Sequence, residues 1–296
     1  MPSWWGWGIN RERVTGTIVS TPIRVLLVED EHEIADMLEL FFSMQGYDFY
    51  HAGDGQEGLE LASRKMPHVI LMDIALPDTD GYALTVKLRW RPRTTHIPIL
   101  FLSKWDSRDE RLMGLSLGGD DYLAKPFDLQ ELLLRIQNSM ARAARDHLTD
   151  LRTGLPAAFM ARDLLEKART DPNEAIIEIS LENGIPYRNV YGSTSGADIS
   201  QVISQLLLGV LNEYGSLEDF IGYLDEDQYV IITAQTNAHT IAEHITAAFH
   251  EAASRLYSAA DRERGAILDG DTQYPLMRLL CRITAGALRT EVASSG

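Results

Sequence analysis

The chain has 296 residues, of which 45% are hydrophobic and 24% charged, and its formal net charge is −16. This composition is typical of a folded protein with room for two ordinary domains, and the acidic excess argues against a nucleic-acid partner, because phosphate binding needs clustered Lys and Arg side chains. The single cysteine, Cys281, excludes an internal disulfide and fits a reducing cytoplasm, and no apolar run approaches the about 20 residues that span a bilayer.

The start of the chain is rich in tryptophan, with three in the first seven residues. It lacks the apolar core of a signal peptide. Two interpretations remain, a tag that binds a partner or a membrane interface, and a poorly ordered extension. We favour the second and expect residues 1–22 to be such an extension.

Residues 23–145 alternate between short apolar runs of strand length and segments with helical periodicity. The expected strands cover 24–28, 47–52, 69–73 and 97–103, with a fifth just ahead of Lys125, and the expected helices cover 31–45, 54–66, 82–90, 107–117 and 128–145. Asp128 is a suitable N-cap for the last helix. Continuous apolar strands that alternate with helices predict an α/β fold, a doubly wound five-stranded parallel sheet covered on both faces.

The ends of these strands carry the candidate site. In a doubly wound sheet, ligands bind at the carboxyl ends of the strands, where this chain places Glu29, Asp30, Asp73, Ser103 and Lys125. Asp73 alone could be a polar cap on a strand. Three converging carboxylates, however, repel one another unless a cation neutralises them, and hard oxygen ligands suit Mg²⁺. Beside such a cation, a carboxylate can act as a nucleophile towards a phosphoryl group.

Four strings, VLLVEDE, LMDIALPDTDGY, FLSK and DDYLAKPF, occur in this order, and together they resemble the receiver domain of two-component response regulators over residues 23–145. The resemblance implies a flavodoxin-like fold and makes Asp73 the phosphoacceptor. Asp30 and Asp73 would be direct ligands of Mg²⁺, Glu29 an indirect one, and the backbone carbonyl of Ala75 a further ligand.

The same resemblance assigns the remaining roles. Ser103 and Lys125 would sense the phosphoryl group, Tyr122 would be the switch aromatic, and Lys125 precedes Pro126 in a pair that can adopt a cis peptide. The expected partners are a histidine kinase, an unknown downstream protein, and a second copy bound through the face of the fourth helix, fifth strand and fifth helix. No DNA and no membrane partner is expected, and the expected location is the cytoplasm.

Beyond residue 145 the pattern changes to that of an α+β domain. A charged connector with a break at Gly154-Leu155-Pro156 is expected to continue the preceding helix and couple the domains rigidly. The expected elements are a strand at 175–181, a helix at 194–215, strands at 219–224 and 228–234, a helix from 238 to about 261, and a strand at 279–288. This order predicts helices packed on a sheet.

The strings DLRTGLPAAFM, VYGSTSGADI, YLDEDQYVII and RITAGAL resemble the diguanylate cyclase, or GGDEF, domain over residues 146–291, and 292–296 form a tail. The chemical residues of that family are mostly replaced. Asp225 and Glu226 stand where the family has a Gly-Gly pair, Asp227 and Gln228 follow them, and Ser180 stands at the position of a metal-binding aspartate.

Further departures affect the nucleotide and the product. Arg188 and Ala197 stand at the guanine-reading positions, and Ser216-Leu217-Glu218-Asp219 keeps only the aspartate of the product-binding motif. Two-metal phosphoryl transfer needs carboxylates and an open phosphate cradle, so we expect no cyclase activity. The acidic residues 225–227 are more simply a solvated turn than a metal site.

The sequence therefore predicts a phosphorelay response regulator, not an enzyme, whose Asp73 is phosphorylated and whose degenerate output domain acts by binding another protein. Two alternatives stay open, a module that senses GTP or cyclic di-GMP without turnover, and an active diguanylate cyclase with a divergent site. A DNA-binding output is not predicted, because no helix-turn-helix with basic recognition residues is evident.

Overall fold

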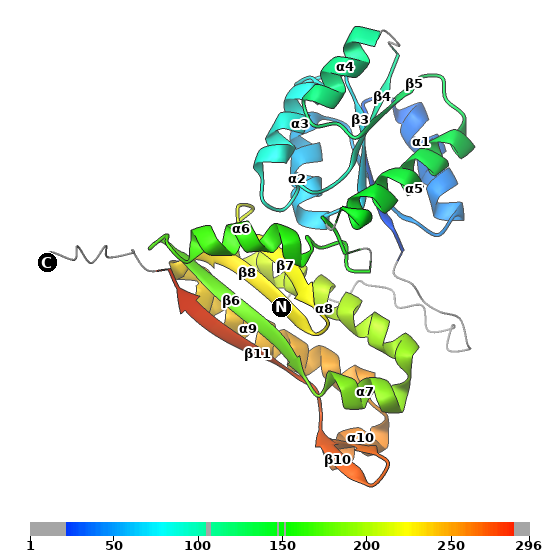
Figure 1. The fold of residues 1–296 in the computed structure, drawn as a ribbon. Helices are drawn as coiled ribbons and strands as arrows, with labels where there is room; N and C mark the ends of the chain where they lie inside the picture. The colour runs from blue at the N-terminus through cyan, green and yellow to red at the C-terminus, as the bar shows by residue number, and fades with distance from the viewer. Residues whose placement is uncertain (1–21, 105–107, 147, 151, 287–296) are drawn as a thin grey trace, which may run out of the picture.

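The protein folds into two domains that lie one above the other (Figure 1). The structure is a computed structural model and describes residues 22–104, 108–146, 148–150 and 152–286. The tryptophan-rich start of the chain, predicted to be an extension, lies outside these residues.

The first domain is built on a parallel sheet. Its strands are β1 (Arg24–Val28), β2 (Asp48–Ala52), β3 (Val69–Asp73), β4 (Ile99–Ser103) and β5 (Asp121–Ala124), in the order β2-β1-β3-β4-β5. The connecting helices are α1 (His32–Met44), α2 (Gly55–Lys65), α3 (Gly81–Trp90), α4 (Arg108–Ser116) and α5 (Leu129–Arg145). All strand pairs are parallel. This is the flavodoxin-like, doubly wound order, so the predicted fold of this half is confirmed.

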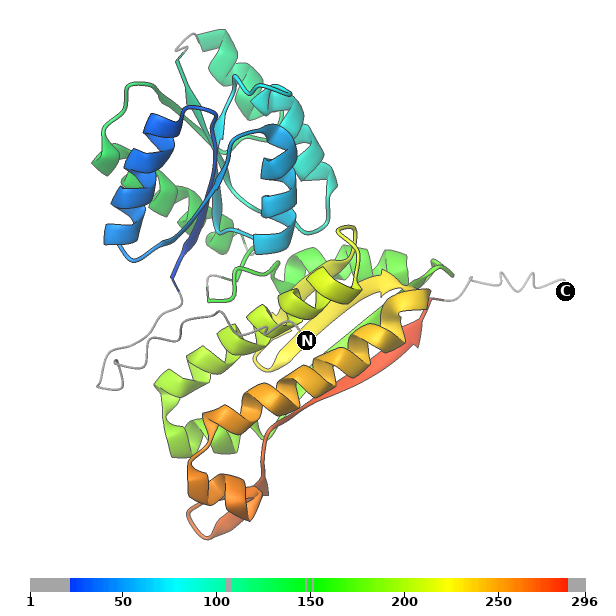
Figure 2. The same ribbon diagram turned by 180° about the vertical axis from the view of Figure 1, so that it is seen from behind.

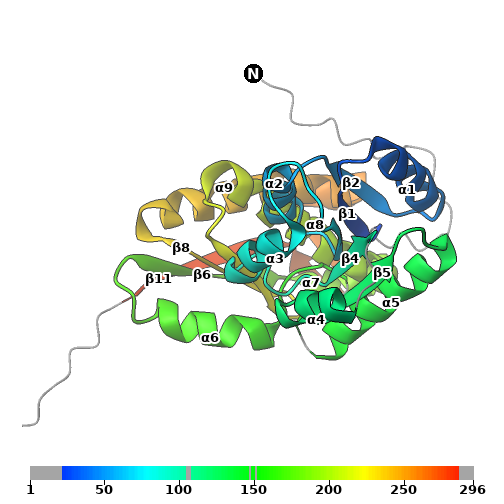
Figure 3. The same ribbon diagram turned by 90° about the horizontal axis from the view of Figure 1, so that it is seen from above.

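Apolar side chains on both faces of this sheet explain why its strands read as continuous apolar runs. Every residue of β1, β3 and β4 is buried. Helices α1 and α5 pack on one face and α2 and α3 on the other (Figure 3). The Asp128 side chain accepts hydrogen bonds from the amides of Gln130 and Glu131, which confirms the predicted N-cap of α5.

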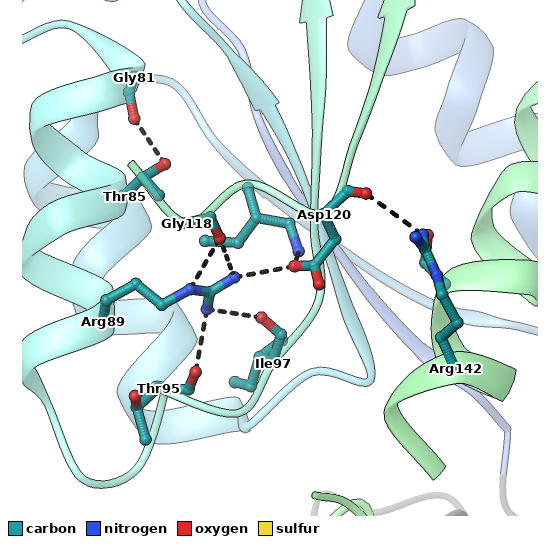
Figure 4. A network of polar contacts seen from close by, with 10 residues as sticks. Gly81, Thr85, Arg89, Thr95, Ile97, Gly118, Asp120 and Arg142 are labelled. Carbon is teal, nitrogen blue, oxygen red and sulfur yellow. Dashed lines mark hydrogen bonds and ion pairs between the residues drawn. The ribbon is translucent and has the colours of Figure 1, made fainter. Parts of the chain in front are cut away.

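Arg89 fixes the loops at the amino-terminal edge of the sheet (Figure 4). Its guanidinium donates to the carbonyl oxygens of Gly118, Thr95 and Ile97. It also contacts the carboxylate of Asp120 at 2.9 Å. The connection between α3 and β4 is therefore held at several points by one side chain.

The second domain is built on an antiparallel sheet. Its strands β6 (Glu174–Glu182), β7 (Phe220–Asp225), β8 (Gln228–Ala234) and β11 (Arg278–Ala285) lie in the order β11-β6-β8-β7. Its helices are α6 (Ala158–Ala168), α7 (Gly184–Tyr191), α8 (Ser193–Tyr214), α9 (Gln235–Ala253) and α10 (Ala259–Arg264). A separate hairpin pairs β9 (Ala266–Asp269) with β10 (Thr272–Pro275).

This sheet carries helices on both faces. Helices α8 and α9 cover one face (Figure 2), and α6 covers part of the other. The predicted strand–helix–hairpin–helix–strand order is confirmed in outline. Helix α7 and the β9–β10 hairpin were not predicted.

The helix predicted from 238 to about 261 is wrong at its carboxyl end. Helix α9 stops at Ala253, a 3₁₀ turn follows at Ser254–Leu256, and α10 is separate. The cause is Tyr257, which is buried in an extended conformation and accepts a 2.7 Å hydrogen bond from the amide of Met277. Tertiary packing of this ring overrides the local helical preference.

The prediction that the connector continues the last helix of the first domain is also wrong. Helix α5 ends at Arg145 and α6 begins at Ala158. Between them, the Asp150 carboxylate accepts hydrogen bonds from the amide and hydroxyl of Thr153, and Gly154 adopts a φ of +71°. This local hydrogen bonding competes with a helix, so no continuous helix joins the domains.

Candidate functional site

The strand ends of the first domain bring three carboxylates together. Glu29 and Asp30 follow β1, and Asp73 ends β3. One ligand oxygen from each lies within 4.8 Å of the others. Glu29 is fully buried and Asp73 is 5% exposed, whereas Asp30 is exposed. The cluster therefore opens to solvent on the side of Asp30.

Lys125 closes the buried side of this cluster. It follows β5, in a cis peptide bond with Pro126. Its Nζ lies 2.5 Å from Oε2 of Glu29 and 2.9 Å from Oδ2 of Asp73. The other Asp73 oxygen, Oδ1, accepts a 2.6 Å hydrogen bond from the amide of Ile74. Both oxygens of Asp73 are thus oriented by the protein.

The charges of the cluster do not balance. Burial raises the pKa of Glu29 to about 7; the repulsion of Asp73 adds to this effect and the contact with Lys125 opposes it. One ammonium faces three carboxylates, which leaves an excess of negative charge and several oxygen ligands. These are the donors that Mg²⁺ prefers, so Glu29, Asp30 and Asp73 fit a hard divalent cation.

The other predicted residues lie at the same edge of the sheet. Ser103 ends β4 and is 2% exposed, and its carbonyl accepts a 2.7 Å hydrogen bond from the amide of Lys125. Tyr122 lies on β5, 7% exposed, within the apolar cluster that contains Phe101. Ala75 lies in the loop after β3, and its role as a carbonyl ligand stays a prediction.

Sequence reasoning missed an ion pair beside this cluster. Nζ of Lys104 lies 2.7 Å from Oε1 of Glu31, and the same oxygen lies 3.9 Å from Nζ of Lys125. The contact with Glu31 raises the pKa of Lys104. A signal was present, because each residue directly follows a predicted site residue in the sequence.

A second missed residue, Asp78, links the loop that follows Asp73 to α2. Its carboxylate accepts hydrogen bonds from the amides of Gly55 at 2.8 Å and Gln56 at 3.0 Å. These hydrogen bonds lower the pKa of Asp78. The loop that follows Asp73 is therefore held against the first turn of α2.

The second domain gathers the predicted degenerate residues at one end of its sheet. Ser180 on β6 pairs in register with Gln228 on β8, and Asp225 ends the neighbouring strand β7. Glu226 and Asp227 form the turn between them, and Asp227 has a φ of +65°. The structure thus brings all five residues together.

An arginine from α7 lies on this turn. The Arg188 guanidinium donates to both carboxylate oxygens of Asp227, at 2.9 and 2.6 Å, and its Nε lies 3.6 Å from Oε1 of Glu226. The hydrogen bond with Asp227 raises the pKa of Arg188. The prediction of a solvated acidic turn is therefore wrong for Asp227, which is paired and largely buried. The side chain of Ala197 lies outside the described residues.

Comparison with known proteins assigns the first domain. Residues 25–137 match the family model of the response regulator receiver domain. The DNA-binding dual master transcriptional regulator RpaA of Synechocystis is 37% identical over 122 residues, covering 41% of this chain and 51% of the relative. The transcriptional regulatory protein TrcR of Mycobacterium tuberculosis is 40% identical over 124 residues, covering 42% and 48%.

A solved structure aligns with the same part of the chain. A putative response regulator from Chloroflexus aurantiacus is 38% identical and covers 41% of this chain and 99% of its own, with a TM-score of 0.39. Because they match that family model, residues 25–137 are a response regulator receiver domain of a two-component system. The chain spans about half the length of the curated relatives it matches.

Among the residues that the structure describes, no helix has the length and apolar character that a transmembrane span requires.

Proposed function

We propose that this protein is a phosphorelay response regulator that a histidine kinase phosphorylates on Asp73 in the presence of Mg²⁺. The observation that carries the proposal is the position of Asp73, whose ligand oxygen lies within 4.8 Å of those of Glu29 and Asp30. Its Oδ2 is also 2.9 Å from Nζ of Lys125.

The chemistry follows from these contacts. Mg²⁺ bound by the carboxylates would neutralise charge on the incoming phosphoryl group. A carboxylate oxygen of Asp73 attacks phosphorus, a new P–O bond forms, and the bond from phosphorus to the donor histidine nitrogen breaks. Lys125 neutralises phosphoryl oxygens, and the hydroxyl of Ser103 donates a hydrogen bond to one of them.

The phosphorylated state would act through the face formed by α4, β5 and α5. Phosphorylation adds up to about two negative charges at the sheet edge, and Tyr122 already lies inward next to this edge. On α4, Leu112 and Leu115 are exposed, and a cavity of about 400 Å³ lies between α4 and α5. Exposed apolar side chains of this kind mark interaction surfaces, and we propose a second copy of this chain as the partner.

We further propose that the second domain is a catalytically inactive, GGDEF-like output domain that acts by binding another protein. Arg188 supports this, because its bidentate contact with Asp227 occupies the one acid that an active site would need for a metal. Ser180 adds no carboxylate. A hydroxyl is a poor ligand for Mg²⁺ compared with a carboxylate.

The phosphoacceptor is tested by incubating the protein with Mg²⁺ and either acetyl phosphate or a histidine kinase, and measuring phosphoprotein by intact mass. We expect incorporation into the wild type and the Asp36→Asn control, whose change lies on α1, and none into Asp73→Asn. Incorporation into Asp73→Asn would refute the site.

The two alternative functions are tested with GTP, cyclic di-GMP and Mg²⁺. We expect neither a thermal shift nor a cyclic dinucleotide product. Glu226 and Asp227 repel an anionic nucleotide, and Arg188 is already paired with them. A saturable shift would favour nucleotide sensing, and product formation would favour an active cyclase.

A further inference from the structure

The receiver domain contacts the second domain through the amino-terminal edge of its sheet, the edge opposite to Asp73 (Figure 1). Arg93, in the loop between α3 and β4, lies at the centre of this contact and has no exposed surface. Its guanidinium donates to the carbonyl oxygens of Asp219 at 2.8 Å and Ser216 at 2.6 Å, and to Oδ1 of Asn212 at 3.2 Å. All three acceptors belong to the other domain.

Further hydrogen bonds orient the acceptors towards Arg93, one within the second domain and one from the receiver domain. The carboxylate of Asp219, a residue only 4% exposed, accepts a 2.7 Å hydrogen bond from the amide of Ser216, which closes the turn that presents both carbonyls. The Asn212 amide donates to the carbonyl of Arg64 at 3.0 Å, and this contact orients its oxygen towards Arg93. Oriented acceptors in a buried site bind a planar, multidentate donor better than a point charge.

The donor is fixed as well. Arg89 holds the carbonyls of Thr95 and Ile97, and the hydroxyl of Thr94 donates to the carbonyl of Leu88 at 2.7 Å. Arg93 therefore extends from a loop with little freedom. Burial lowers the pKa of Arg93, and the negative charges of Asp219 and Glu218 oppose this shift.

Neighbouring contacts follow the same edge. Nη2 of Arg24 donates to the carbonyl of Thr153 at 3.2 Å and to that of Met66 at 2.9 Å. The Met66 side chain is fully buried in the apolar cluster of the second domain. If the domains separate, the buried guanidinium of Arg24 loses its hydrogen bond to Thr153, and a buried charge without its partner is unfavourable.

We propose that Asn212, Ser216 and Asp219 form a guanidinium-binding pocket, and that Arg93 seated in it locks the two domains into one arrangement. The pocket recognises a guanidinium by its carbonyl and amide oxygens and does not accept an ammonium equally well. This inference does not depend on phosphorylation of Asp73, because the lock forms from residues far from that site.

The test uses the full chain without a phosphate donor. Arg93→Ala and Arg93→Lys are compared with the wild type and with Arg91→Ala, a matched control whose interdomain ion pair, to Glu218, spans 4.0 Å. Small-angle scattering gives the radius of gyration, and hydrogen exchange gives the protection of residues 216–219. We expect both Arg93 variants to be more extended and to exchange faster at 216–219 by tenfold or more, and Arg91→Ala to match the wild type.

Chemical rescue tests the chemistry of the pocket. Millimolar methylguanidinium added to Arg93→Ala should restore protection at 216–219, and methylammonium at the same concentration should not. An Arg93→Ala protein with wild-type dimensions and exchange would overturn the lock. Opening without rescue by methylguanidinium, or with equal rescue by methylammonium, would overturn the guanidinium pocket.

Asn212→Ala provides a second route to the same test from the other domain. It removes one acceptor and leaves Arg93 in place, so it should increase exchange at 216–219 in the same direction. If circular dichroism shows that Arg93→Ala is unfolded, Asn212→Ala becomes the test of the lock. Wild-type hydrogen exchange in Asn212→Ala would then overturn the proposal.

Discussion

The guanidinium of Arg188 and the carboxylate of Asp227 form a bidentate pair, with contacts of 2.9 and 2.6 Å. The side chains are only 15% and 16% exposed. Asp227 also adopts a φ of +65°, and its carbonyl accepts a hydrogen bond from the amide of Leu181. Arg188 thus neutralises one of the three acidic side chains of this hairpin, Asp227.

Replacing Arg188 should therefore destabilise the second domain. In Arg188→Ala, Asp227 keeps its partly buried charge and loses its partner, which costs about 2 kcal/mol. Urea unfolding measures the change. The control is Arg169→Ala, which breaks an exposed pair with Glu166 (54% and 69% exposed) and should leave the midpoint almost unchanged. Equal effects of the two changes would contradict the structural role of the Arg188 pair.

Removing one carboxylate of the acidic cluster should raise stability in EDTA and remove most of the stabilisation by Mg²⁺. In EDTA, Asp30→Asn should melt higher than the wild type, because it relieves repulsion from Glu29 and Asp73. On addition of Mg²⁺, the wild type should gain stability by mass action, and Asp30→Asn should gain little. Thermal unfolding measures both effects, with Asp36→Asn as the control. A wild-type response to Mg²⁺ in Asp30→Asn would exclude Asp30 as a ligand.

Gly154 is a position where even a methyl group should disturb the contact between the domains. It has a φ of +71°, and an added Cβ would lie 2.4 Å from Nη2 of Arg24 and 2.9 Å from Nε2 of His68. Gly46 has a φ of +78°, and a Cβ added there would have no heavy atom within 4 Å. Gly46→Ala therefore measures the backbone cost alone, about 1 kcal/mol. Gly154→Ala should cost clearly more in thermal unfolding. A cost equal to that of Gly46→Ala would show that Arg24 and His68 adjust freely.

Two buried histidines predict loss of stability in acid. Burial lowers the pKa values of His68 and His96 to about 3, from the ordinary 6.5. Below pH 6.5 the unfolded chain therefore binds more protons at these histidines than the folded chain does. Their contribution to the free energy of unfolding is fully present above pH 6.5 and is lost as the pH falls towards 3. From pH 6.5 to 5 the loss is about 2 kcal/mol for each histidine.

Urea unfolding at pH 7.5 and pH 5 measures this loss. The His68→Gln variant should lose less stability between the two pH values than the wild type, because one of the two titrating groups is gone. The control His239→Gln changes an exposed histidine on α9 and should follow the wild type. If His68→Gln has the same pH dependence as the wild type, His68 does not carry the effect.

The receiver fold and its acidic cluster could be predicted because both follow from local patterns. The buried strands β1, β3 and β4 are continuous apolar runs, and the rule that strand ends share one edge places Asp73 beside Glu29 and Asp30. No contact between distant side chains was needed for either prediction.

The contacts of the arginines could not be predicted in the same way. Arg93 and Asp219 are 126 positions apart, and Arg188 and Asp227 are 39 apart, with no periodicity that joins them. The charged segment after Arg145 has good helix formers, but α5 stops at Arg145 and Asp150 and Thr153 form hydrogen bonds that compete with a helix. The partner of each arginine and the end of this helix depend on polar groups that come close only in the folded chain.

The burial of Arg93 limits how freely this receiver could be exchanged for another during evolution. A foreign receiver inserted ahead of residue 146 would bring its own intact phosphorylation chemistry. Without an arginine at the equivalent of position 93, however, it would lack the guanidinium that donates to the carbonyls of Ser216 and Asp219 at the junction. Productive recombination between such modules therefore requires the incoming receiver to supply this side chain together with its phosphorylation site.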